Sequence, residues 1–111
     1  MVKWPAIIKH TDDAELIYVS DASEWDNDAD IHNFEYSETD CLIDSFGNIF
    51  TLTDRQKNYV NPQAVGKLIP LYEVVGLVKA HAAHTGSCCV SKLYAPSISD
   101  AFKIVRSLSE Q

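Results

Sequence analysis

Glycine is scarce in this sequence, and its placement excludes the common phosphate-binding loops. The four glycines stand far apart, at Gly47, Gly66, Gly76 and Gly86. A P-loop or a dinucleotide-binding fingerprint needs several glycines within a few residues, because the backbone must approach a phosphate closely. The chain also lacks the G-x-S-x-G and H-E-x-x-H motifs of the common hydrolases and metalloproteases. These gaps favour a protein that is not an enzyme, without deciding the question.

Cysteine is also sparse, and long apolar runs are missing. The three cysteines are Cys41, Cys88 and Cys89. Adjacent cysteines rarely form a disulfide with each other, so the pattern predicts reduced thiols. No uncharged apolar run approaches the ~18 residues that span a bilayer, and no secretory signal follows the N-terminus. We therefore expect a cytoplasmic protein without membrane contact.

The composition indicates one globular domain over residues 1–111. Of these residues, 46% are hydrophobic and 10% are aromatic. A chain of this length and composition can bury a core of its own without disulfides. We therefore predict a single domain.

Basic residues are rare in the first third of the chain. Residues 1–40 carry eleven acids and two lysines, a net charge of −9, whereas residues 41–111 carry five acids and seven bases, a net charge of +2. Dense carboxylates repel a phosphate backbone, so direct binding of nucleic acid is not expected. A basic protein surface is the partner that such a charge distribution favours.

Two β-hairpins are predicted in the first half of the chain. The first pairs residues 4–10 with residues 15–20, and the second pairs residues 40–44 with residues 49–53, where Gly47 allows a tight turn. Between the hairpins, Asp21 and Glu24 have the spacing of a capping box, which predicts a short helix over residues 22–28. The rest of the stretch up to residue 33 is interpreted as an acidic loop.

The second half predicts two main helices. One begins at Pro70, has a single apolar stripe and ends at Gly86, and the other begins at a capping box formed by Ser97 and Asp100. Asn61 and Pro62 predict a short helical turn. The apolar run Cys88–Tyr94 predicts a late strand.

The order of these elements predicts the fold class α+β. We expect an antiparallel sheet of four to five strands, made of the two β-hairpins and the late strand, with the two main helices packed on one face.

His81, His84, Cys88 and Cys89 form the first candidate site. His81 and His84 are three residues apart on a predicted helix, and imidazole and thiolate are preferred zinc ligands. Adjacent residues of a strand point to opposite faces, so both cysteines cannot easily reach one ion; either Cys88 or Cys89 joins the histidines, and Cys88 is the residue that we name. The alternative is that these residues are ordinary parts of the core and of a helix end, with no cofactor bound.

The acidic stretch forms the second candidate site. Its predicted protein-binding residues are Asp21, Glu24, Trp25, Asp26, Asp28 and Asp30. A calcium loop starting at Asp26 fails, because Ile31 stands where the loop needs glycine and Ser37 where it needs glutamate. The remaining alternatives are a docking surface for a protein partner and a solvated acidic surface.

Residues 42–50, LIDSFGNIF, together with the Trp4-Pro5 start and the chain length, resemble a family of small gammaproteobacterial proteins of unknown function. The resemblance implies a bacterial, cytoplasmic protein of the kind solved in structural-genomics work, and it assigns no functional residues. The function that the sequence favours is a non-enzymatic protein-binding or regulatory module with an acidic N-terminal face. The alternative is a small metal- or thiol-dependent protein with a site at His81, His84 and Cys88.

Overall fold

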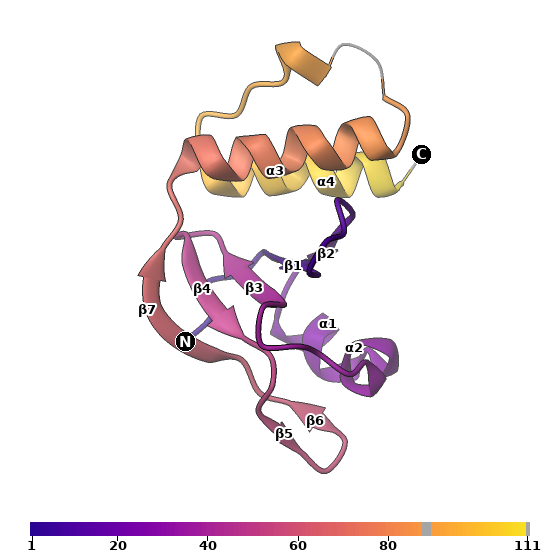
Figure 1. Cartoon of the computed structure of the whole chain (residues 1–111), viewed down its shortest axis with the longest axis vertical. Coiled ribbons are helices and arrows are strands. Elements are labelled where there is room, and N and C mark those ends of the chain that lie inside the picture. Colours follow the sequence, from indigo (N-terminus) through magenta and orange to yellow (C-terminus); the bar gives the residue numbers. More distant parts are fainter. Residues whose placement is uncertain (88–89, 111) are drawn as a thin grey trace.

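The computed structural model describes residues 1–87 and 90–110, and it is built around a five-stranded antiparallel sheet (Figure 1). The strands lie in the order β2-β1-β3-β4-β7. Their bounds are β1 Ala6–Lys9, β2 Leu16–Val19, β3 Cys41–Asp44, β4 Asn48–Thr51 and β7 Gln63–Leu68. A separate small hairpin consists of β5 Arg55–Gln56 and β6 Tyr59–Val60.

In residues 1–87 and 90–110, four α-helices and one short 3₁₀ helix accompany the sheet. Their bounds are α1 Ala22–Asn27, α2 Ala29–Asn33, α3 Leu71–His84, η1 Val90–Lys92 and α4 Ile98–Ser109. Figure 1 shows α3 and α4 side by side at one end of the molecule, with α1, α2 and the β5–β6 hairpin toward the opposite end. In the described part of the chain, no helix has the length and apolar character needed to cross a membrane. The predicted fold class, α+β with two main helices packed against an antiparallel sheet, is confirmed.

Both predicted hairpins are present, and the second depends on a buried carboxylate. Asp44 is fully buried at the β3–β4 turn, where its side chain accepts hydrogen bonds from the backbone N–H groups of Lys3, Phe46 and Asn48 at 3.0, 3.0 and 2.9 Å. Gly47 has φ +83°, and a Cβ there would stand 2.7 Å from the carbonyl oxygen of Ile69. Only glycine therefore fits this turn.

The alternation of side chains along the strands creates two cores. Ile7 and Ile43 face α3 and α4, where they meet Val74, Val78 and Phe102. The second core lies on the opposite side of the sheet, and its members are Ala6, Ile8, Val19, Trp25, Ile31, Leu42, Phe50, Leu52 and Val60. We call α1, α2 and the β5–β6 hairpin, which close this second core, the acidic cover, and we call α3 and α4 the apolar cover. The sheet is thus covered on both faces.

Three local predictions were wrong. Residues 29–33 form α2 rather than a loop, because Asp28 caps that helix. Asn61 and Pro62 do not open a helical turn but precede β7, whose six residues are all exposed at the edge of the sheet and so lack an alternating pattern. The predicted strand Cys88–Tyr94 is replaced by η1 over Val90–Lys92, while Cys88 and Cys89 lie outside the described residues. The fifth strand is therefore β7.

Candidate functional site

The first helix of the acidic cover begins at the predicted N-cap Asp21, but the reciprocal bond of a capping box is shifted by one residue, from Asp21 to Ser20. The Asp21 carboxylate accepts a hydrogen bond from the backbone N–H of Glu24 at 2.8 Å. The Glu24 carboxylate in turn accepts from the backbone N–H and the hydroxyl of Ser20, at 3.3 and 2.9 Å. These three hydrogen bonds fix the start of α1 beside the end of β2.

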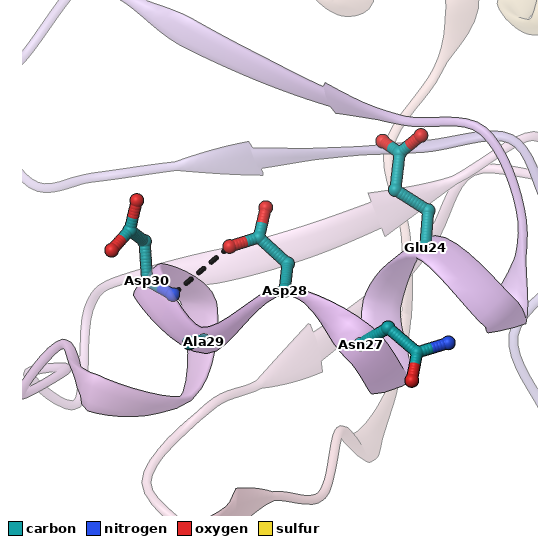
Figure 2. A pocket seen from close by; sticks show the side chains of 5 residues that line it. All are labelled: Glu24, Asn27, Asp28, Ala29 and Asp30. Atoms are coloured by element: carbon teal, nitrogen blue, oxygen red, sulfur yellow. Dashed lines mark hydrogen bonds between the residues drawn. The ribbon is translucent and has the colours of Figure 1, made fainter.

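A single residue, Asp28, separates the end of α1 from the start of the second helix, α2. Asp28 accepts hydrogen bonds from the backbone N–H groups of Asp30 and Ile31 at 2.9 and 3.3 Å. Figure 2 shows the carboxylates of Glu24, Asp28 and Asp30 projecting to the same side of α1 and α2, while Asn27 turns away from them. An open hollow of about 430 Å³ lies against these residues and Ala29.

Among the residues that the structure describes, the carboxylates of this surface have no basic partner within ion-pair distance. In the described ranges, the ion pairs join His10 to Asp40, Lys103 to Asp100 and Arg106 to Glu110. None of them involves the acids that we group as the acidic face, namely Asp21, Glu24, Asp26, Asp28 and Asp30. Four of these acids are exposed and Asp28 is partly buried. The surface therefore presents negative charge that the fold does not neutralise.

Trp25 does not belong to the exposed surface, although the sequence suggested it as an anchor for a partner. Its side chain is 1% exposed, and its indole N–H donates to the carbonyl oxygen of Val60 at 3.2 Å. The ring stands edge-on to His32, with centroids 5.6 Å apart. Trp25 thus joins α1 to the β5–β6 hairpin as a core residue.

His32 is a second link between the parts of the acidic cover. It is 5% exposed, its Nδ1 accepts from the backbone N–H of Val60 at 3.0 Å, and its Nε2 is 2.7 Å from the carbonyl oxygen of Trp25. An Nδ1 that accepts and an Nε2 that donates define one neutral tautomer. The Arg55 guanidinium adds hydrogen bonds to the carbonyl oxygens of His32 and Phe34.

A cleft of about 590 Å³ borders the acidic face on its β5–β6 side. The walls of this cleft include Trp4, Trp25, Asp26, Phe50, Tyr59 and Pro62. The Tyr59 hydroxyl donates to the Asp26 carboxylate at 2.8 Å, and burial together with this hydrogen bond raises the pKa of Tyr59. The sequence did not reveal the cleft, because its walls come from segments far apart in the chain. An aromatic residue in each of several segments is too weak a signal to predict their meeting.

The predicted metal ligands fall into different environments. His81 is 3% exposed, and its Nδ1 accepts from the backbone N–H of Leu16 at 2.9 Å. Burial lowers the pKa of His81, the Glu15 charge opposes this effect and the His84 charge adds to it. His84 is exposed at the last residue of α3, and Cys88 lies outside the described residues. The set of His81, His84 and Cys88 therefore stays a prediction.

Comparison with known proteins places the chain in a family. Residues 4–105 match the profile of DUF4144, a family described as "protein structure with unknown function". The chain belongs to the DUF4144 family. This finding confirms the resemblance to a family of unknown function that the sequence suggested.

A solved structure similar to this DUF4144 chain is described as the NMR structure of the protein from Shewanella amazonensis. The two chains are 26% identical, the TM-score is 0.71, and the match covers 97% of this chain and 90% of that chain. No curated protein matches the sequence. The similar structure comes from a gammaproteobacterium, in agreement with the expected bacterial family.

Proposed function

We propose that this DUF4144 protein is a non-enzymatic protein-binding or regulatory module, and that the acidic face is its docking surface. The observation that supports the proposal is the set of five carboxylates without a basic partner in the described residues. A partner with clustered lysine or arginine side chains would neutralise them. Charges of this kind at a surface speed association and select the partner more than they add affinity.

The cleft beside the acidic face gives the partner a place for an apolar side chain. Trp4 and Trp25 have ring centroids 6.1 Å apart, and both line the cleft together with Asp26. Interfaces gain most of their affinity from a few apolar anchors in pockets, with charged groups around them. We therefore expect a basic segment that carries one aromatic or large aliphatic residue.

The proposal can be tested with a synthetic peptide of alternating lysine and alanine with one central tryptophan. We expect NMR shift changes at residues 21–31 and 59–64, and binding that weakens steeply with added salt. The variant Asp26→Asn with Asp30→Asn removes two charges and leaves both helix caps in place. The matched control, Glu35→Gln with Glu38→Gln, removes two exposed charges outside the acidic face.

The two variants decide the outcome. Weaker binding of the peptide by the acidic-face variant, with little change in the control, supports the docking surface. Equal weakening in both variants would mean that only the net charge matters, and shift changes confined to α3 and α4 would place binding elsewhere. Either of these results rejects the proposal.

A further inference from the structure

Three potential metal ligands converge at the end of the molecule away from the acidic face. Asp13 and Glu15 lie on the connection between β1 and β2, and His84 is the last residue of α3. Each residue offers one ligand atom, and these atoms all lie within 4.8 Å of one another. Atoms bound to one ion at about 2.0–2.2 Å must lie closer together than about 4.4 Å. Small rotations of exposed side chains therefore suffice to close the site.

The two segments that supply these ligands are fixed to each other in the fold. The backbone N–H of Leu16, the residue after Glu15, donates to Nδ1 of the buried His81 at 2.9 Å. His81 stands one helical turn before His84 on α3. The backbone N–H of Glu15 also donates to the Asp13 carboxylate at 2.9 Å, which orders the connection between the strands. The convergence is thus a product of tertiary structure.

The surroundings of the cluster favour a cation. His84 lies at the C-terminal end of α3, where the helix dipole presents partial negative charge. The two carboxylates add to this negative potential. His81 is 3% exposed and accepts from Leu16 through Nδ1, so its proton lies on Nε2 and it is not one of the ligands.

We propose that Asp13, Glu15 and His84 bind one divalent transition-metal ion of the zinc type. One imidazole with two carboxylates is a mixed nitrogen and oxygen donor set, which suits zinc and its neighbours better than calcium or magnesium, whose sites use oxygen alone. Three exposed protein ligands leave a coordination position open to water or to a further ligand. This site shares no element with the acidic face, so each proposal can fail without the other.

The first test is calorimetric titration of the purified protein with Zn²⁺, and with Mg²⁺ and Ca²⁺ for comparison. We expect Zn²⁺ to bind one ion per chain, and the affinity to fall more than about tenfold in His84→Ala and in Glu15→Gln. Asp12→Asn is the matched control, because Asp12 is an exposed acid next to Asp13 that does not belong to the cluster. The control should keep the wild-type affinity.

A cysteine variant separates this site from the set His81, His84 and Cys88. Cys88→Ser should leave Zn²⁺ affinity unchanged, and bound Co²⁺ should lack the charge-transfer absorption of a thiolate ligand. Far-ultraviolet circular dichroism of each variant confirms that it is folded. Failure of the wild type to bind Zn²⁺, an unchanged affinity in Glu15→Gln, or a loss of affinity in Cys88→Ser would each overturn the proposal.

Discussion

The two covers of the sheet are fixed by different kinds of contact. The apolar cover has two long helices, 14 and 12 residues, whose buried side chains such as Val78 and Phe102 interlock over the sheet. The acidic cover has two helices of 6 and 5 residues, with Trp25 and Ile31 as their large buried apolar side chains. Polar contacts from Asp21, Asp28 and His32 position these short helices.

This difference has consequences for stability and motion. Buried apolar area supplies most of the free energy of folding, so the apolar cover should open only when the whole domain unfolds. Short helices that depend on caps and a few hydrogen bonds open locally at lower free energy. A surface whose short helices can open locally can adapt its shape to a partner. The proposed docking surface lies on these helices.

The strongest test of the comparison is Phe102→Ala in the apolar cover. Phe102 is fully buried, and truncating a buried phenylalanine costs about 3–5 kcal/mol in the free energy of unfolding. Urea denaturation followed by circular dichroism measures the change. Lys103→Ala, at a neighbouring exposed position, should change stability by less than about 0.5 kcal/mol. If Phe102→Ala cost less than 1 kcal/mol, roughly the value of one helix cap, the apolar cover would not dominate stability.

Asp40→Asn tests the polar contacts that join the connection between α2 and β3 to the connection between β1 and β2. Asp40 is 5% exposed and accepts from the backbone N–H groups of Ser37 and Thr11, both at 2.7 Å, and from the Thr11 hydroxyl at 2.9 Å. Burial alone would raise the pKa of Asp40, but these hydrogen bonds outweigh it and hold the pKa below its usual 3.8. We expect the variant to lose about 2 kcal/mol at pH 7.

The pH dependence of that loss has a definite sign. A carboxyl group whose pKa is lower in the folded state stabilises the fold above its unfolded pKa, and this contribution disappears as the pH falls through the folded pKa. The difference between wild type and Asp40→Asn should therefore be largest at neutral pH and shrink below about pH 4. Urea midpoints measured from pH 7 to pH 3 give this difference. Parallel curves would show that the charge of Asp40 does not matter.

The same contrast explains which parts of the fold the sequence predicted. The helices of the apolar cover have periodic stripes and a cap at Ser97, so local pattern and tertiary packing agree. The hairpin turn at Gly47 was equally clear from the sequence, because glycine is the residue that most readily adopts the positive φ of a tight turn. In contrast, α2 is too short for periodicity to show, and β7 is an edge strand without a buried face.

The candidate sites were harder to predict for a related reason. The acidic residues of the docking surface could be named from composition, because charge density is local in the sequence. Trp25 was named with that surface as well, but its side chain is buried, and nothing in residues 21–30 shows that its partner is the carbonyl oxygen of Val60. The cluster of Asp13, Glu15 and His84 joins residues about 70 positions apart, which the hydrogen bond between Leu16 and His81 and the packing of Leu16 in the core with Val78 bring together.

A smaller effect is expected from Asp28→Ala, which removes the cap of α2. The Asp28 carboxylate accepts from two backbone N–H groups, and losing such a cap costs about 1 kcal/mol. Asp30→Ala is the matched control, because Asp30 is a neighbouring acid whose side chain makes no cap. Thermal unfolding of both variants should therefore distinguish the effect of losing the cap from the effect of losing one negative charge. Equal destabilisation would show that charge in the first turn, rather than the cap, supports α2.

The smallest expected effect comes from Tyr59→Phe, which removes one hydroxyl between the β5–β6 hairpin and α1. The hydrogen bond to Asp26 is exposed, so the global free energy of unfolding should fall by about 0.5 kcal/mol or less. Hydrogen exchange gives the sharper measurement, because the lost contact belongs to the acidic cover alone. Amides of α1 and β6 should exchange several-fold faster, while those of α3 and α4 keep their protection. Uniform acceleration across all helices would mean that the two covers open together.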